Sequence, residues 1–546
     1  MDETSPSERV ARSAGVVSAA VALSRISGLV REVLMAGLFG AGMAYDAFLL
    51  GFRVPNLARD LFAEGALSSA FVPTFTAYLA RSRREAAELA NQVTAAVFLV
   101  IGVVCLAGIF LSPAIVSVMA PGFSEVPGKS ELAVHLMRIM FPFLLLVALA
   151  AQAMGILNSC NQFGVPALSS TFFNLGSVAF GLALGFWWGP SLGISQLEGM
   201  AYGVVIGGAL QLAWQLPALW RAGFAFKLRF DWSHPGLRHI VRLMGPAILG
   251  GAAVQVNIVV NTIFASQIVD PVRGMDGPTS WLNYAFRFMQ LPLGLFGVSI
   301  AAATLPSISR SIASGDMEEY RTTLARSLGM VFLLTIPSSV GLMVLGETMI
   351  GAVYQSGRFE VYDTRQTALA LSYYAIGLSG YAALKVLAPA FYALGDARTP
   401  MMVSVLSIGM NLGLATMLVY VWGMGHAGLA LSTSLVAVSG FAVLFAILHR
   451  RIGGIHGWHL LGGFSRTLVA ATMMGVAAAG IHAGLVSFLG ISKLGRLLDV
   501  VITVPVGLIV FYLAARLMRV PELTLALRGV YGLFGKLPPV QRATIE

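Results

Sequence analysis

The sequence predicts an all-α polytopic membrane protein with about fourteen transmembrane helices. Hydrophobic residues make up 57% of the 546 residues, and charged residues make up only 11%. A soluble domain carries about 25% charged residues. The apolar residues also gather in runs of about 20, the length that a helix needs to cross a bilayer.

The expected spans follow one another along the chain, and only short polar connectors separate them. The second span is interrupted at Pro55, where a broken helix is expected. The spans are 13–40, 45–79, 90–111, 133–157, 165–188, 199–220, 239–266, 281–308, 324–346, 366–393, 400–422, 426–448, 464–486 and 495–518.

The formal charge of +10 reflects membrane topology rather than nucleic-acid binding. With the N-terminus inside, about 22 Lys and Arg residues fall in inside segments, against about six outside. Basic residues collect in cytoplasmic loops, so both termini are expected in the cytoplasm. The two cysteines, Cys105 and Cys160, both lie in apolar context. No metal-ligand spacing or P-loop appears, so no metal, cofactor or ATP hydrolysis is expected.

Charged residues inside the apolar runs are the main functional signal. Residues 24–32 read SRISGLVRE within the first span. Each charge costs about 2.5–3.5 kcal/mol at a helix centre, so these side chains should face a wet cavity or one another. The intramembrane cations are Arg25, Arg31, Arg53, Arg59, Arg138, Arg287 and Lys385, and the acids are Glu32, Asp46, Asp60 and Glu64. For Arg138 and Lys385, snorkelling or internal pairing explains the charge equally well.

The spacing of these residues places many of them on shared helix faces. Arg25 and Glu32 are seven residues apart and share a face. Four residues follow at i, i+3, i+7 and i+11 and form one polar stripe if the helix is continuous, with Asp46 one heptad earlier: Arg53, Asn56, Asp60 and Glu64. Such a mixed-charge wall suits an anionic, hydrogen-bonding substrate.

The chain also contains an internal repeat. Phe52-Arg53 followed by Phe62 recurs as Phe286-Arg287 followed by Phe296, with one constant offset between the two sets of positions. The segments 157–166 and 391–400 show the same offset. Because six helices separate the copies, the repeat is parallel, and its pseudo-two-fold axis is expected along the membrane normal. Two six-helix lobes with a site between them, plus two C-terminal helices, form the layout of an alternating-access carrier.

Small residues predict close packing between helices. Gly181 and Gly185 are four residues apart, as are Gly203 and Gly207. Such spacing lets two helix backbones approach closely.

Several motifs resemble the MurJ (MviN) lipid II flippase family. They are SRISGLVRE, FGAG-x3-DAFLLGFRVPNL and EGALSSAFVP near the N-terminus, and GPAILG, NTIFAS, KVLAPAFYA and GHAGLALS further on. The similarity runs over nearly the whole chain. It implies the multidrug/oligosaccharidyl-lipid/polysaccharide (MOP) exporter fold, in the bacterial inner membrane.

The resemblance implies a flippase for lipid II, the undecaprenyl-diphosphate-linked peptidoglycan precursor, moving it from the cytoplasmic to the outer leaflet. Its partners would be lipid II, membrane lipids and other cell-wall synthesis proteins, and no catalytic residue is expected. Expected domains are 1–230 and 231–455 as the two lobes, 456–520 as a lipid-tail groove and 521–546 as a cytoplasmic tail. The resemblance carries cavity roles to Arg25, Arg31, Asp46, Asn56, Arg59, Glu64 and Arg287. The polar stripe adds Arg53 and Asp60 to the expected cavity residues, and Glu32 and Lys385 are further candidates for the cavity.

The chain departs from the family pattern at two places. Many members have two arginines where this chain reads Arg59-Asp60, and acids near the counterpart of Arg287, where it reads Phe286 and Gln290. The alternatives are a related MOP exporter of another polyprenyl-linked glycan or of a drug, and a membrane glycosyltransferase. A cation exporter favours acids over arginines in its cavity, and a glycosyltransferase needs a large outside loop that is absent from this sequence.

Overall fold

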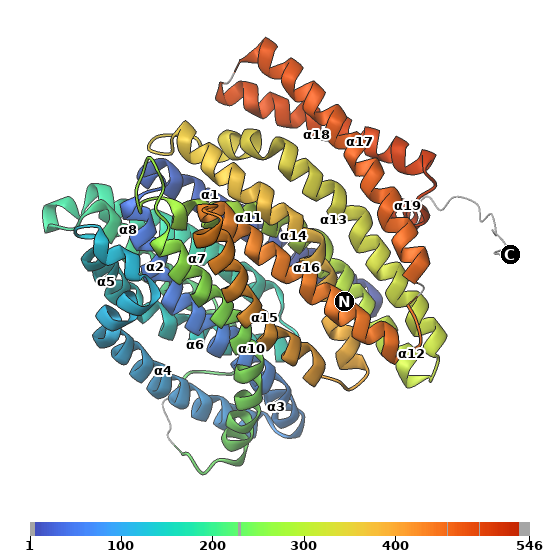
Figure 1. Cartoon of the computed structure of the whole chain (residues 1–546). Helices are drawn as coiled ribbons and strands as arrows, with labels where there is room; N and C mark the ends of the chain where they lie inside the picture. The colour runs from blue at the N-terminus through green and yellow to red at the C-terminus, as the bar shows by residue number, and fades with distance from the viewer. Residues whose placement is uncertain (1–5, 228–230, 456, 491, 534–546) are drawn as a thin grey trace. The chain divides into compact units, whose positions relative to one another are not determined.

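The computed structural model describes residues 6–227, 231–455, 457–490 and 492–533. Within these ranges every regular element is a helix, which confirms the predicted all-α class (Figure 1). The chain divides into two compact units, residues 1–280 with 356–359 and residues 281–355 with 360–546. The domain boundaries expected at 230, 455 and 520 remain predictions.

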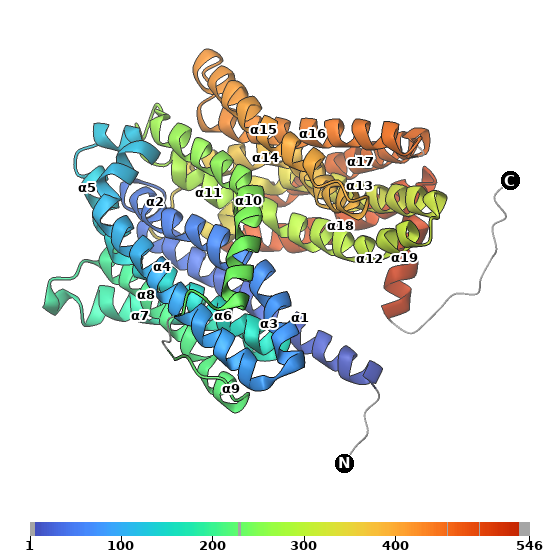
Figure 2. The same ribbon diagram turned by 90° about the horizontal axis from the view of Figure 1, so that it is seen from below.

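The first unit is built from helices that follow the chain from blue to green (Figure 2). They are α1 (Pro6–Phe39), α2 (Met43–Ala58), η1 (Arg59–Leu67), α3 (Ser68–Arg81), α4 (Arg83–Met119), η2 (Pro121–Glu125), α5 (Lys129–Met140), α6 (Pro142–Ser159), α7 (Gly164–Leu182), η3 (Ala183–Trp187), η4 (Pro190–Leu192), α8 (Gln196–Ala213), α9 (Leu216–Arg221) and α10 (Pro235–Gln267).

The second unit contains the remaining helices, apart from the first turn of α11. They are α11 (Pro278–Pro292), η5 (Leu293–Val298), α12 (Ser299–Ala313), α13 (Met317–Tyr354), α14 (Val361–Ala393), α15 (Arg398–Thr416), η6 (Met417–Val421), α16 (Gly425–Arg451), α17 (Gly457–Leu489), α18 (Lys493–Leu517) and α19 (Pro521–Leu533).

The count of fourteen spans is not confirmed. Among the described residues, 11 helices are long and apolar enough to cross a membrane, or up to 12 if the bent helix α10 is one span. The two expected spans without a match are 13–40 and 45–79, which carry the charged residues of interest. Helix α1 has 34 residues, which is long enough to cross a bilayer.

The internal repeat is visible in unusual helical segments. Four of the described segments are π-helical, with wider i→i+5 turns. Segment η1 begins at Arg59 and η5 at Leu293, while η3 begins at Ala183 and η6 at Met417. The starts of both pairs are separated by the same offset that the sequence motifs show. Because two pairs of π-helical segments recur at this offset, the two copies of the repeat share a backbone pattern.

Helix starts repeat at the same offset. Helix α4 begins at Arg83 and α13 begins at Met317. The residue before each start caps the helix: Ser82 accepts a hydrogen bond from a backbone N–H of α4, and Asp316 accepts one from α13. Such caps satisfy backbone donors that have no partner inside the helix. The orientation of the pseudo-two-fold axis remains a prediction.

The glycine motifs form the predicted contact between α7 and α8. A Cβ atom added at Gly203 would lie 2.4 Å from the backbone oxygen of Ser177 and 2.7 Å from the Cα of Gly181. A Cβ added at Gly199 would lie 2.4 Å from the Cα of Gly185. Only glycine lets the two backbones approach this closely.

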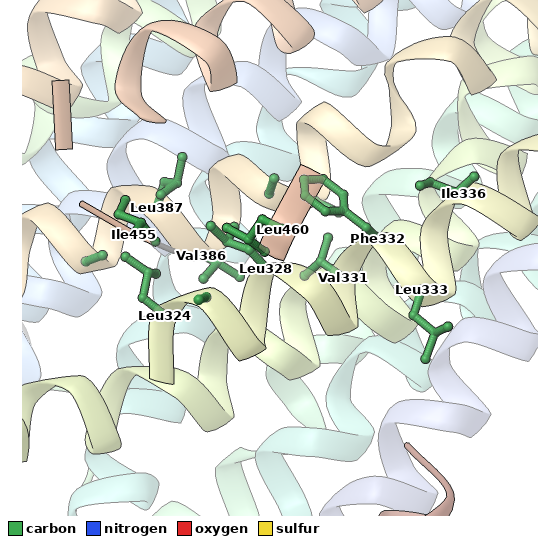
Figure 3. Close-up of a cluster of buried hydrophobic side chains, with 14 of the residues drawn as sticks. Leu324, Leu328, Val331, Phe332, Leu333, Ile336, Val386, Leu387, Ile455 and Leu460 are labelled. Carbon is green, nitrogen blue, oxygen red and sulfur yellow. The ribbon is translucent and has the colours of Figure 1, made fainter. Parts of the chain in front are cut away.

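The core of the second unit surrounds helix α13. Leu328, Val331 and Phe332 of α13 pack with Val386 of α14 and Leu460 of α17 (Figure 3). Helix α18 also contributes buried side chains to this cluster. The two C-terminal membrane helices therefore pack on the second unit and form part of its core.

We predict that Gly203→Ala lowers the thermal unfolding midpoint of the purified protein. The new methyl group would meet backbone atoms that cannot rotate away, and overpacking of this kind costs about 1–3 kcal/mol. Gly102→Ala in α4 is the matched control, because no atom lies within 4 Å of its added Cβ. Equal midpoints for the two variants would contradict the close packing of α7 on α8.

Candidate functional site

Helix α1 holds Arg31 among aromatic rings. The guanidinium carbon of Arg31 lies 5.3 Å from the ring centre of Phe173 on α7 and 5.9 Å from that of Phe52 on α2. Cations over aromatic faces gain roughly 0.5–2 kcal/mol. The half-buried Arg31 therefore has a defined position against α2 and α7.

Helix α1 is fixed to α7 by an amide. Nδ2 of Asn174 donates to Oγ of Ser27 at 3.1 Å and to the backbone oxygen of Ser24 at 3.2 Å. Arg25 lies between Ser24 and Ser27 in the chain, and Glu32 follows five residues after Ser27. Arg25 is exposed and Glu32 is buried. The shared face predicted from their spacing therefore passes through two different environments.

The second charged segment brings three predicted residues together. Oδ1 of Asp60 accepts hydrogen bonds from Nε and Nη2 of Arg59 at 3.2 and 2.8 Å, and Oδ2 accepts one from Nδ2 of Asn56 at 3.5 Å. All three side chains are partly buried. Arg53, one turn earlier, donates to Oγ1 of Thr262 on α10 at 3.0 Å.

The predicted stripe of polar residues does not continue as an α-helix. The segment η1 starts at Arg59, so the turns become wider four residues after Pro55 rather than breaking at it. The wider turn changes the register after Arg59, and the i+7 and i+11 spacing no longer applies. Glu64 lies in η1, and its side chain falls outside the described residues.

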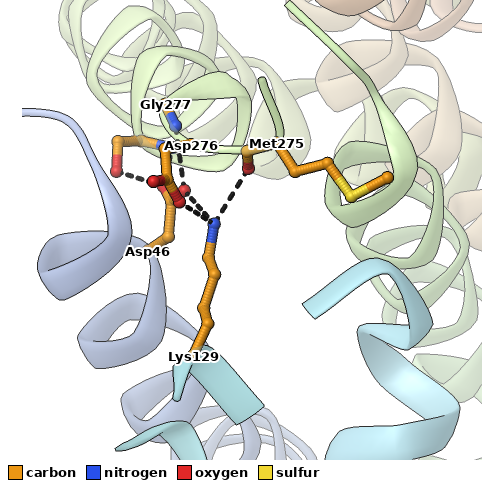
Figure 4. Close-up of polar contacts among 6 residues, drawn as sticks. Asp46, Lys129, Met275, Asp276 and Gly277 are labelled. Atoms are coloured by element: carbon orange, nitrogen blue, oxygen red, sulfur yellow. Dashed lines mark hydrogen bonds and ion pairs between the residues drawn. The ribbon is translucent and has the colours of Figure 1, made fainter. Parts of the chain in front are cut away.

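Asp46 lies in a separate, fully buried ion pair (Figure 4). Its Oδ2 lies 2.9 Å from Nζ of Lys129 and accepts from the backbone N–H of Gly277 at 3.0 Å. Its Oδ1 accepts from the backbone N–H and the hydroxyl of Ser280. Asp46 therefore does not join the Asn56–Arg59–Asp60 cluster, and a substrate could reach its carboxylate only if these hydrogen bonds opened.

Lys129 is shared between several acceptors. Its ammonium also donates to Oδ1 of Asp276 at 2.7 Å and to the backbone oxygen of Met275 at 2.9 Å, and it lies 4.4 Å from the ring centre of Phe123. The sequence places Lys129 in an outside connector, and hydropathy gives no sign of a partner 83 residues away. The sequence indicates this pair only indirectly: Asp46 is an acid in an apolar segment, and a buried acid needs a cationic partner.

The second copy of the repeat has a corresponding contact. Nε1 of Trp281 donates to Oδ1 of Asp363 at 3.0 Å, and both side chains are fully buried. Asp363 occupies the position in the second copy that Lys129 occupies in the first. In each copy, a buried polar contact therefore ties the start of one membrane helix to the start of another.

The other two predicted residues belong to the second unit. Arg287 on α11 and Lys385 on α14 are both exposed. The described residues contain no group of three His, Cys, Asp or Glu side chains that could hold a metal ion. The arrangement in the first unit offers guanidinium groups and amide or carboxylate partners, which suits binding of an anionic, hydroxyl-bearing molecule.

Solved structures with the same fold define the class of this protein. An inward-facing multidrug resistance MATE family transporter of the MOP superfamily aligns with a TM-score of 0.64 at 16% identity, covering 80% of this chain and 96% of that one. The structure described as "Lipid II flippase MurJ, inward closed conformation" aligns with a TM-score of 0.73 at 26% identity, covering 92% of this chain and 98% of that one. The chain therefore shares the fold of these membrane transporters.

Sequence comparison gives the family. The profile of the family described as "Lipid II flippase MurJ" matches residues 35–496. The "Probable lipid II flippase MurJ" of Vibrio cholerae is 34% identical, with 82% of this chain and 85% of that one aligned. The "Lipid II flippase MurJ" of Burkholderia cenocepacia is 33% identical, with 80% and 83% aligned. This chain belongs to the lipid II flippase MurJ family. The profile begins after Arg25, Arg31 and Glu32.

We predict that Lys129→Met strongly destabilises the first unit. The change leaves Asp46 buried beside Asp276 without a cation, and breaking a buried pair in this way costs about 3–5 kcal/mol. The thermal unfolding midpoint of the purified protein should fall, and Asp46→Asn in the Lys129→Met background should restore part of the loss.

The control for this prediction is Arg84→Met. Arg84 pairs with Glu88 at 3.2 Å on the exposed face of α4, and such exposed pairs contribute within about 1 kcal/mol. A Lys129→Met protein as stable as Arg84→Met would show that the buried pair contributes little.

Proposed function

We propose that this protein carries lipid II from the cytoplasmic to the outer leaflet of the bacterial inner membrane by alternating access. The observation that carries the proposal is the presence of four arginines in the first two expected spans. Arg25 and Arg31 lie in α1, Arg53 lies in α2 and Arg59 begins η1, whereas the buried Asp46 is already paired with Lys129. Such charges are costly at membrane depth, so their presence needs a functional reason.

A diphosphate group in the substrate would explain why arginines lie in these helices. Guanidinium groups remain charged and present planar forks that match phosphate oxygens. Arg31, held over two rings, and Arg53, held by Thr262, would bind the phosphates with little loss of side-chain freedom. Arg287 is proposed as a further phosphate ligand from the second unit, and Lys385 as an additional cation.

The polar partners of the arginines would form hydrogen bonds with the rest of the headgroup. Asp60 orients Arg59, and Asn56 shares the same carboxylate. Sugar hydroxyls and peptide amides would exchange with these internal hydrogen bonds. Glu64 and Glu32 are proposed to take part in the same role, whereas Asp46 would contribute only after its contacts with Lys129 and Ser280 open.

The remaining features of the proposal follow from the carrier role. Both termini lie in the cytoplasm, as the distribution of basic residues favours. Helices α17 and α18 are proposed to guide the polyprenyl tail, since the tail is best left in lipid while the headgroup crosses. The protein acts without chemical conversion of its cargo, and other cell-wall synthesis proteins are its proposed partners.

Replacement of Arg31 tests the proposal. We expect Arg31→Ala to lower the lipid II that reaches the outer leaflet by about tenfold or more, because a charged hydrogen bond is worth about 1.5–3 kcal/mol. Arg31→Lys should restore function only partly, since it keeps the charge but loses the fork. Arg25→Ala should behave like Arg31→Ala. The measurement is cleavage of lipid II by an impermeant enzyme added outside cells that depend on the variant.

Two controls separate binding from folding. Arg84→Ala changes an exposed arginine of α4 and should leave transport unchanged. If Arg25 is instead a structural partner of Glu32, Arg25→Ala should lower the amount of membrane-inserted protein, and the Arg25→Ala/Glu32→Gln double variant should recover it. Full transport by both single alanine variants at normal protein levels would refute the proposed role of the arginines.

A further inference from the structure

A polar cavity lies within the second unit, between α13, α14, α17 and α18. Its volume is about 380 Å³, which is within the range of small-molecule sites. The lining residues come from the C-terminal ends of α13 and α17 and the N-terminal ends of α14 and α18. Figure 1 shows α17 and α18 side by side, with α13 next to α17. The cavity therefore lies at one end of this group of helices.

Arg496 forms the inner wall of the cavity. Its guanidinium donates to Oε1 of Gln355, which also accepts from the hydroxyl of Thr364 at 3.1 Å. Arg496 is only 7% exposed, and it packs so closely on Gly351 that any side chain there would collide with it. The hydrogen-bond acceptor that holds Arg496 is thus a neutral amide, so an anion in the cavity would meet a preoriented positive charge.

His482 on α17 and Asp499, one turn after Arg496 on α18, also line the cavity. Nδ1 of His482 lies 2.5 Å from Oδ2 of Asp499, whose Oδ1 accepts from the hydroxyl of Thr503 at 2.8 Å. Asp499 is buried, whereas His482 is partly exposed. Since one ring nitrogen is engaged by the carboxylate, the second nitrogen of His482 is the one available to a ligand.

An ion pair stands at the exposed side of the cavity. Nε of Arg365 lies 3.6 Å from Oε1 of Glu347, and their side chains are 68% and 53% exposed. This separation is longer than a hydrogen bond, so both groups retain capacity for a ligand. Exposed apolar side chains of Met343 and Leu369 line the same cavity.

We propose that this cavity binds the headgroup of a membrane phospholipid in which a phosphodiester carries a primary amine. Arg496 and Arg365 would bind the phosphate, and Glu347 would bind the ammonium group. A zwitterionic headgroup suits this lining, which contains two arginines and two carboxylates. An anion without the amine would be repelled by a carboxylate of the lining. Met343 and Leu369 would contact the first carbons of the acyl chains. This lipid is distinct from the transported cargo, and its site does not depend on the arginines of the first unit.

Native mass spectrometry of the purified full-length protein tests the proposal. Dioleoylphosphatidylethanolamine should bind more tightly than dioleoylphosphatidylglycerol, and dioleoylglycerol should bind least. Arg365→Gln should weaken binding of both phospholipids by about tenfold, equivalent to about 1.4 kcal/mol. Glu347→Gln should remove the preference for the amine lipid while phosphate-dependent binding remains. Both residues are exposed, so these variants should fold.

Lys493→Gln is the matched control, because Lys493 is an exposed cation at the same end of α18 that does not line the cavity. It should leave all three affinities unchanged. Equal binding of dioleoylglycerol and the phospholipids, or equal effects of Lys493→Gln and Arg365→Gln, would overturn the proposal. Displacement of the lipid by inorganic phosphate alone would assign the site to free phosphate instead. Because the readout is binding rather than transport, the result is independent of the proposed flippase activity.

Discussion

The cost of placing charge inside an apolar helical protein governs this structure. A buried ion loses its hydration, and only a partner with good geometry offsets that loss. The chain meets the requirement in several ways. Asp46 and Lys129 pair directly, Arg31 lies over the rings of Phe52 and Phe173, and Asp499 accepts from His482 and Thr503. Each arrangement also fixes the contact between two or more helices.

Most of the fold can be predicted from the sequence, because apolar runs and their repetition are local properties. The all-α class, the constant offset of the repeat and the glycine contact between α7 and α8 all appear in the structure. The predicted count of fourteen spans is not confirmed, because residues 13–40 and 45–79 have no match among the described helices that are long and apolar enough to cross a membrane.

The candidate site can be predicted only in part. Spacing places Asn56 and Asp60 on one face, and the structure joins them through the carboxylate of Asp60, which also binds Arg59. Spacing also places Asp46 on that face, but the structure pairs it with Lys129. The physical cause is that Lys129 comes from a distant part of the chain, where local spacing gives no information about contacts. Helical spacing describes faces, whereas ion pairs depend on tertiary contacts.

The contact between Asp46 and Ser280 has a consequence for how such a chain can be built. The two residues occupy the same place in the two copies of the repeat, 234 residues apart. Two aspartates at these places would set two carboxylates against each other, and two serines would leave Lys129 without its buried anion. The contact requires the copies to differ in sequence. A dimer of two identical half-length chains could not form it, so this buried pair requires two copies that have diverged in sequence.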